Sequence, residues 1–467
     1  MKTNLLRQRA PVRSRALLVL LVGSFGVFIV FLDTTIVNVA FETISRGFHT
    51  TTGHLAWVLN AYSLVFAAML IPAGRLADIF GRRRLFLAGL IGFALTSALC
   101  GAAPDAGVLI AGRALQAIFA ALVLPTSLAL ILPEFPPGRR HVAVATWGSM
   151  GAAAAACGPT VGALLTEFAS WRWVFLVNVP ICVVVLTAGW VLLRESKDPA
   201  ATGIPDPIEV LLVAAVPAAL SFSIIEGPER GWTDPWVIGG FVVAAALLPV
   251  FVWRGRTSST PVLDPVLFRV RQFRLTNAAT LLFGTAFYAY LLGNVIFLQT
   301  TWHYSVLRAA LALSPSPLVT TLVARFAGTL AGRIGYRPVL ISGATVFAGA
   351  MAWFALAVDA NPHWLTHWLP AAVLAGVGIG STLPVQSAAA TQHLPPARYG
   401  LGTAVNSSFR QLGAVLGISV FVAVLGTPTA ATAVADFHRA WWVVAGFSLA
   451  SGLVWLVPKL GRPTAAR

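Results

Sequence analysis

The chain has 467 residues, of which 57% are hydrophobic and only 10% are charged, whereas soluble domains carry roughly 25% charged residues. This composition excludes an ordinary water-soluble domain and indicates a protein that lies among membrane lipids. The formal net charge of +16 does not indicate nucleic-acid binding, because the basic residues are scattered through short connections and form no basic stripe.

Apolar stretches long enough to cross a bilayer recur along the whole sequence, and each crossing needs about 20 apolar residues. The first stretch is too long for the apolar core of a signal peptide, so we expect it to stay as the first span. The fold class is therefore an all-α polytopic membrane protein with about fourteen spans. They are expected at 16–40, 55–75, 84–103, 107–131, 141–165, 172–193, 208–226, 236–253, 275–298, 308–332, 338–357, 365–390, 400–426 and 437–457.

Basic residues collect on one side of this arrangement. The N-terminal segment shares its side with the triplet Arg82, Arg83 and Arg84, and the opposite connections hold few arginines. Cytoplasmic connections of membrane proteins are enriched in Lys and Arg. The pattern therefore predicts that both termini are cytoplasmic.

An internal repeat divides the chain. GRLADIFGRR at 74–83 and GTLAGRIGYR at 328–337 share Gly, Leu, Ala, Gly and Arg in one register, and each follows an even-numbered span. Parallel repeats of this kind indicate two similar bundles with a binding site between them. We expect an N-terminal six-helix bundle at 1–200, two accessory helices and a cytoplasmic linker at 201–274, and a C-terminal six-helix bundle at 275–467.

A carboxylate lies in the middle of the first span. Inserting a charged residue such as Asp33 at the centre of a membrane helix costs about 2.5–3.5 kcal/mol of free energy, even on the insertion scale that gives the lowest values. Gly26 and Ala40 lie seven residues to either side, so Asp33 shares a small-residue face that packs into a bundle. Burial favours its neutral form and a nearby cation its charged form, which suits proton coupling. A hydrogen bond that only fixes helix packing is the alternative.

The fourth span carries Arg113 and Gln116 one turn apart, on a face with Ala117 and Ala120. A buried arginine needs a partner, and Asp33 is a candidate. The alternative for Arg113 is an anchor that reaches the membrane surface.

The fifth span has a stripe of small residues at intervals of three or four, Gly148, Gly151, Ala155, Gly158 and Gly162, and Pro159 is expected to bend it. Such a stripe permits close helix contact, either for sliding during transport or for packing alone. We expect this helix to meet the tenth span near Ala310.

Polar and aromatic side chains in other spans are candidates for a substrate cavity, although aromatic belts at the membrane surface explain the aromatic ones equally well. The candidates are Asn38, Trp57, Asn60, Tyr62, Gln116, Tyr288, Asn294, Gln299, Gln386 and Asn406. His363 and His367 have the spacing of helical metal ligands, but without an acidic general base they are expected to be interfacial residues, so no metal site is predicted. The sequence has no phosphate-binding loop or nucleophile elbow, so no enzyme activity is expected.

An ordered set of motifs runs through nearly the whole chain: LDTTIVNVA (32–40), GRLADIFGRRR (74–84), RALQAIFAA (113–121), GPTVGALL (158–165), WRWVFLVNVPI (171–181), EGPERGW (226–232) and RQLGAVLG (410–417). With these motifs the chain resembles the fourteen-helix drug:proton antiporter family of the major facilitator superfamily. The resemblance implies a twelve-helix core with two inserted helices. It also implies a monomeric, proton-coupled exporter of small amphiphilic drugs or natural products in the bacterial cell (inner) membrane, with the proton gradient as its energy source and no cofactor.

The resemblance further implies roles for particular residues. Asp33 and Arg113 would couple transport to protons. A cytoplasmic latch would involve Gly74, Asp78, Gly81, Arg82 and Arg83, and it would be one-sided because Gly332 stands at the matching position of the second repeat. Gly158, Pro159 and Gly162 match the antiporter signature, which favours export.

Two other functions stay open at this point. The chain could be an uptake or exchange transporter for a nutrient or metabolite, which the fifth-span signature separates from an exporter only by analogy. A membrane sensor is the more remote alternative, because the sequence offers no soluble signalling domain.

Overall fold

The computed structural model describes residues 10–136, 140–197, 203–258, 260–262, 267–392, 394, 399–426, 428–429 and 431–456. In this part of the chain every regular element is helical. The α-helices are α1 (Ala10–Phe48), α2 (Thr52–Phe80), α3 (Arg82–Gly101), α4 (Ala106–Ile131), α5 (Arg140–Phe168), α6 (Trp173–Leu176), α7 (Asn178–Leu192), α8 (Pro207–Arg230), α9 (Pro235–Thr257), α10 (Arg271–Thr300), α11 (Val306–Leu313), α12 (Pro315–Ile334), α13 (Tyr336–Ala357), α14 (Leu369–Thr391), α15 (Tyr399–Leu425) and α16 (Ala433–Leu453). Short 3₁₀ turns lie at Leu132–Glu134, Leu267–Arg269 and Val454–Leu456, and a π-helical turn lies at Trp364–Trp368.

Within the described residues, 13 helical stretches are long and apolar enough to cross a membrane, which confirms the all-α polytopic fold class. Two of the expected spans are interrupted: 172–193 is divided into α6 and α7, and 308–332 into α11 and α12 where Pro315 begins the second helix. The 29-residue helix α5 occupies the place of the fifth expected span but is not among the 13. The count of fourteen therefore stays a prediction.

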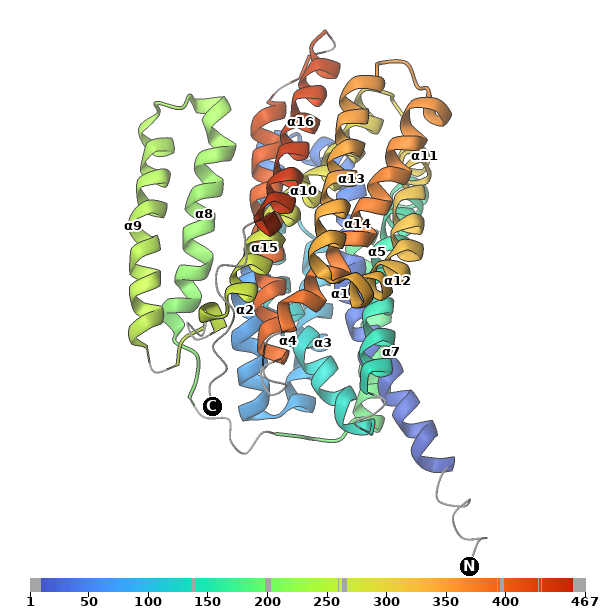
Figure 1. Cartoon of the computed structure of the whole chain (residues 1–467), viewed down its shortest axis with the longest axis vertical. Helices are drawn as coiled ribbons and strands as arrows, with labels where there is room; N and C mark the ends of the chain where they lie inside the picture. The colour runs from blue at the N-terminus through green and yellow to red at the C-terminus, as the bar shows by residue number, and fades with distance from the viewer. Residues whose placement is uncertain are drawn as a thin grey trace, which may run out of the picture.

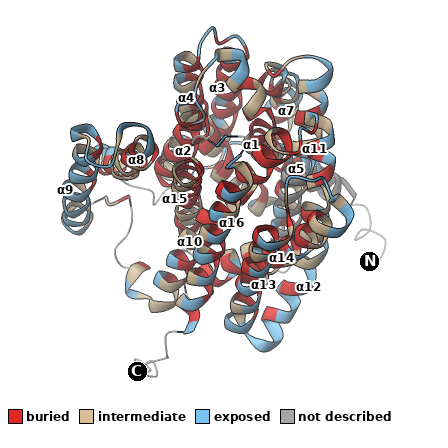
Figure 2. Cartoon of the chain, turned by 90° about the horizontal axis from the view of Figure 1, so that it is seen from above, coloured by how far each residue is buried: buried red, intermediate tan, exposed pale blue. Residues whose placement is uncertain are grey.

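The helices pack in two groups with a separate hairpin beside them (Figure 1). In the first group α1 packs on α5, and α4 packs on α2 and α3; in the second, α10 packs on α15 and α14 packs on α12 and α13. The hairpin of α8 and α9 stands apart, and α8 contacts α2 and α15 while α9 is largely exposed (Figure 2). The domain boundaries at 200 and 274 stay predictions.

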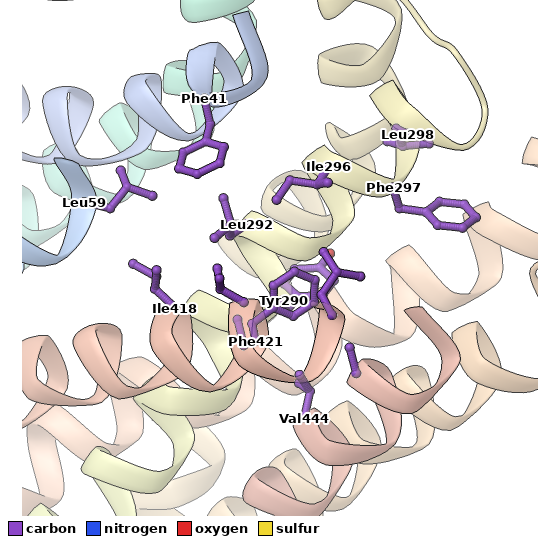
Figure 3. Packing of buried hydrophobic residues seen from close by; sticks show 14 of the residues in the cluster. Phe41, Leu59, Tyr290, Leu292, Ile296, Phe297, Leu298, Ile418, Phe421 and Val444 are labelled. Atoms are coloured by element: carbon purple, nitrogen blue, oxygen red, sulfur yellow. The ribbon is translucent and has the colours of Figure 1, made fainter. Parts of the chain in front are cut away.

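A large apolar cluster joins the two groups. Phe41 of α1 and Leu59 of α2 belong to the same cluster as Leu292 of α10 and Ile418 of α15, and all four are almost fully buried (Figure 3). Inside a bilayer, close van der Waals packing of such side chains holds helices together, so this cluster stabilises the contact between the groups.

The contacts between the groups are uneven along the molecule. Near the end of α1 that is remote from the N-terminus, the Gln299 side-chain amide on α10 donates to the Val39 carbonyl at 3.1 Å. Towards the other end α12 is widely exposed, with Leu318 66%, Leu322 65% and Phe326 64% exposed. The two groups are thus in contact near Val39, and α2 and α15 also meet further along, where Ser408 Oγ donates to the Ala67 carbonyl at 2.8 Å.

Candidate functional site

Asp33 and Arg113 form an ion pair inside the first group. Arg113 Nη1 lies 2.6 Å from Asp33 Oδ2, and the two side chains are 1% and 0% exposed. The pair forms because α1 packs on α4 at this level. Charge-assisted bonds of this length are strong, and removing one partner of a buried pair typically costs about 3–5 kcal/mol because the other charge stays buried.

The second carboxylate oxygen of Asp33 is held by two amides. Gln116 Nε2 donates to Oδ1 at 3.1 Å, and Asn178 Nδ2 donates to it at 2.9 Å. Both amides also lie 3.1 Å from the Ser97 hydroxyl oxygen, which in turn donates to the Phe175 carbonyl at 2.8 Å. The network therefore ties α1 to α3, α4 and the α6–α7 junction.

An aromatic ring covers the guanidinium on its other side. The Cζ atom of Arg113 lies 4.0 Å from the centre of the Tyr62 ring and 5.7 Å from that of Phe175. A desolvated cation–π contact is worth about 2 kcal/mol. The Tyr62 hydroxyl is buried beside the Thr34 side chain. Arg113 is thus held by one carboxylate, by the Gln116 carbonyl oxygen at 2.6 Å and by aromatic faces.

Two members of this network were not among the predicted site residues. Asn178 is an isolated amide in an otherwise apolar span, which is a signal that could have indicated a buried partner. Ser97 gave no such signal, because a serine in a membrane helix usually bonds to its own backbone. The network therefore includes two residues without a predicted role, although Asn178 lies within the motif WRWVFLVNVPI (171–181).

The predicted latch loop is bonded to its own half. Arg82 donates to Asp78 through Nε at 2.9 Å, and its backbone N–H donates to the Ser196 carbonyl at 2.9 Å. Glu195 accepts from the first backbone N–H groups of α3, those of Arg83 and Arg84, at 3.1 and 3.2 Å. These bonds suit a carboxylate at a helix N-terminus. In this conformation Asp78 has its ion pair within the same half.

The two glycines of the predicted latch differ in how strongly sterics require them, and they also differ in place, since Gly74 lies inside α2 and Gly81 lies between α2 and α3. Gly81 has φ +118°, which L side chains rarely adopt, and a Cβ there would approach the Glu195 carboxylate to 2.7 Å. A Cβ on Gly74 would meet Pro125 only at 3.7 Å, an ordinary contact distance.

Arg83 is directed towards α7, where its Nη2 donates to the Trp190 carbonyl at 2.7 Å.

The small-residue stripe of α5 faces α1. A Cβ on Gly158 would fall on the Thr35 side chain, 2.9 Å from Thr35 Cβ, and a Cβ on Gly162 would lie 2.9 Å from the Ile36 carbonyl oxygen. The expected meeting of this helix with the tenth span is confirmed, because α5 packs on α11 and α12, but Gly158 and Gly162 themselves face α1. The meeting near Ala310 does occur, but through Ala163, which shares an apolar cluster with Ala310. Pro159 lies inside the helix beside this contact.

The predicted cavity residues are not gathered around one hollow. Asn38 bonds to its own helix, to the Thr34 carbonyl at 2.9 Å, and Trp57 packs against the large cluster. In the second group, Asn294 accepts from Trp441 Nε1 at 2.9 Å, and Asn406 donates to Asn277 and Thr280 at 3.1 and 2.9 Å.

The remaining candidates are buried between helices or reach the edge of a hollow. Gln386 lies 3.4 Å from Ser451, and Tyr288 is 7% exposed beside Phe287. Asn60 bonds across the groups to Ser419 at 3.0 Å. A cavity of about 350 Å³ lies between α1, α5 and the α10–α11 connection, and among the ten candidates only Gln299 lines it. The substrate-cavity role of this set stays a prediction.

Among the described residues, no group of three or more His, Cys, Asp or Glu side chains could hold a metal ion. The rings of His363 and His367 lie 5.0 Å apart at the turn that begins α14.

Known proteins resemble this chain over nearly its whole length. It is 34% identical over 431 residues to "Multidrug resistance protein Stp" of Mycobacterium tuberculosis, covering 91% of this chain and 78% of that protein. It is also 34% identical to "Puromycin resistance protein pur8" of Streptomyces alboniger (86% and 80% covered) and 30% identical to "Methylenomycin A resistance protein" of Bacillus subtilis (97% of each).

Solved structures share the fold. The human organic anion transporter MFSD10 superposes with a TM-score of 0.65 at 17% identity, covering 96% of this chain and 100% of that one. The sequence model of the Major Facilitator Superfamily matches residues 23–418 and 276–466. With these matches and the two packed helix groups, the chain belongs to the Major Facilitator Superfamily of membrane transporters.

Proposed function

We propose that this chain is a proton-coupled exporter of small amphiphilic compounds, working as a monomer in the cell membrane of a bacterium with both termini in the cytoplasm. The observation that carries the proposal is the buried pair of Asp33 and Arg113. The names of the relatives, which concern multidrug, puromycin and methylenomycin resistance, support drug-like organic compounds as substrates.

The geometry suggests how a proton would act. Oδ2 of Asp33 is occupied by Arg113, and Oδ1 by two amides. A proton that binds the carboxylate removes the charge that holds the guanidinium, and Arg113 then keeps its contacts with Gln116, the Val58 carbonyl and the Tyr62 ring. Because the network joins α1, α3, α4 and α7, its rearrangement would change how these helices pack. Two such arrangements are what alternating access needs.

The conformation described here fits the cytoplasm-facing state of such a cycle. The groups are in contact near Val39 and Gln299, at the end remote from the N-terminus, and α12 keeps an exposed face towards the other end. With a cytoplasmic N-terminus, a compound would enter from the cytoplasm. The proton gradient would then supply the energy without a cofactor.

The deciding experiment uses purified protein in proteoliposomes with an imposed pH gradient and puromycin or ethidium as the probe. An antiporter accumulates the probe in the direction opposite to proton flow, and the Asp33→Asn variant loses this accumulation while remaining folded. Accumulation in the same direction as proton flow would indicate uptake. Gradient-driven accumulation by Asp33→Asn equal to that of the unaltered protein would refute the coupling role.

A further inference from the structure

A second carboxylate is fully buried outside the Asp33 network. Glu209, in the first turn of α8, is 0% exposed. Its Oε2 accepts a hydrogen bond from the Val262 backbone N–H at 2.5 Å. Its Oε1 is buried and has no hydrogen-bond partner among the described residues. No part of the proposed coupling network uses this group.

Glu209 lies beneath the connection that leads from α9 to α10. The Asp206 backbone N–H donates to the Thr260 carbonyl at 3.4 Å, and Arg75 of α2 donates to the Pro261 carbonyl at 3.4 Å. The side chain of Val262 belongs to a buried apolar cluster that includes Ile71 of α2, Val213 of α8 and Val405 of α15. Residues 260–262 therefore fasten the accessory hairpin to the place where the two helix groups meet.

Among the described residues, no cation forms an ion pair with Glu209, and Arg254 acts on it only from a longer distance. On α9, Arg254 bonds to Asp206 through Nε at 2.7 Å, and this hydrogen bond lowers the pKa of Asp206 below its usual range. On α2, Arg75 reaches the connection at the Pro261 carbonyl. Val405 of α15 and Val262 of the connection, which pack in the neighbouring cluster, are apolar. An ionised carboxylate held by one hydrogen bond in such surroundings is far more costly than a neutral acid.

We propose that Glu209 is a second proton-binding site of this transporter, which holds residues 260–262 against α8 while protonated and releases them on losing its proton. The proton leaves to cytoplasmic water, and the carboxylate then carries a charge that the apolar cluster cannot solvate. Water reaches Oε1 only if the Val262 bond opens. Because the same cluster holds Ile71 and Val405, its opening loosens α2 from α15.

The first test is infrared spectroscopy of the full-length protein during a pH titration. A protonated carboxyl group has a C=O stretching band that a carboxylate lacks. We expect Glu209→Gln to lose one titrating band that the unaltered protein shows. The matched control is Glu229→Gln, the same substitution at an exposed position on the same helix, which keeps the band. Identical titrating bands in the unaltered protein and in Glu209→Gln would overturn the proposal.

The second test is hydrogen–deuterium exchange of the peptide that contains Val262, corrected for the intrinsic pH dependence of exchange. If opening requires the loss of one proton, protection falls about tenfold per pH unit above the transition. Glu209→Gln removes this slope, and Glu229→Gln keeps it. The unaltered protein provides the test even if Glu209→Gln fails to fold. Protection of this peptide that does not change with pH would then contradict the proposal.

Discussion

Asn60 of α2 donates a hydrogen bond of 3.0 Å to the hydroxyl of Ser419 on α15, across the contact between the two helix groups. Both side chains are fully buried, and Asn60 Oδ1 has no partner among the described residues. The bond therefore belongs to the closed arrangement seen here and is lost wherever α2 and α15 separate.

We expect Ser419→Ala to destabilise this arrangement by about 0.5–1.5 kcal/mol, the net contribution of one intramolecular hydrogen bond. Spin-label distances between the start of α2 and the end of α15, which are the ends nearer to Asn60 and Ser419, would then show a larger separated population. The matched control is Ser448→Ala, which removes a buried serine that bonds to the Ala344 carbonyl within the second group. Equal populations in the two variants would mean that the Asn60 bond does not bias the conformation.

The Asp33 pair leads to a prediction about stability as well as transport. Asp33→Asn leaves Arg113 buried without its countercharge, so we expect the variant to stay folded but to lose about 3–5 kcal/mol of stability. The double variant with Arg113→Gln removes both charges and should recover much of that loss without recovering transport. Thermal unfolding in detergent measures the first effect, and pH-driven transport the second. Additive stability losses in the double variant would argue against a direct pair.

The Asn178 amide is predicted to position the Asp33 carboxylate. Asn178→Ala removes one bond to Asp33 and one to Ser97, and a hydrogen bond to a charged group contributes about 1.5–3 kcal/mol. We expect coupled transport to fall about tenfold or more and its pH profile to shift. Asn406→Ala, which removes a buried amide in the second group, should leave the pH profile in place. A purely structural role would lower both variants' rates without moving the profile.

Sequence patterns were sufficient for the fold class because the length and polarity of each apolar stretch are local properties. The partnership of Asp33 with Arg113 was one of two interpretations, since a buried arginine needs an anion but can also reach the membrane surface. The direction of the α5 stripe could not be predicted, because a smooth face fits either α1 or the opposite group, and only packing selects Thr35 as the neighbour of Gly158. The burial of Glu209 could not be predicted either, because a glutamate at a helix start has the pattern of an ordinary surface residue.

Asp78 is predicted to act on conformational populations and not on binding. Its ion pair with Arg82 stays within one half, so this contact does not hold the cytoplasm-facing state together. Asp78→Asn should therefore slow turnover more than it weakens substrate binding. Glu134→Gln is a suitable control, because Glu134 also follows an even-numbered span and also forms an ion pair with an arginine, Arg15. A large loss of binding with unchanged spin-label distances would rule out the latch role.

The last prediction concerns the close contact of α5 with α1. At Gly158 even a methyl group would collide with Thr35, and its carbon would lie only 3.4 Å from the Ile36 backbone nitrogen. Gly158→Leu should therefore displace α1 at Thr35, which is only two residues from Asp33, and so lower export severely. Membrane insertion should be spared, because leucine is no less apolar than glycine.

Controls separate this packing effect from a general one. Gly148 has no neighbour within 4 Å of an added Cβ, so Gly148→Ala should export normally. Thr35→Ala removes the hydroxyl that the new side chain meets, so it should partly rescue Gly158→Ala. Efflux and cysteine labelling at both membrane faces measure the outcome. If Gly158→Leu expresses well, exports normally and labels like the unaltered protein, the tight α1–α5 contact has no part in transport.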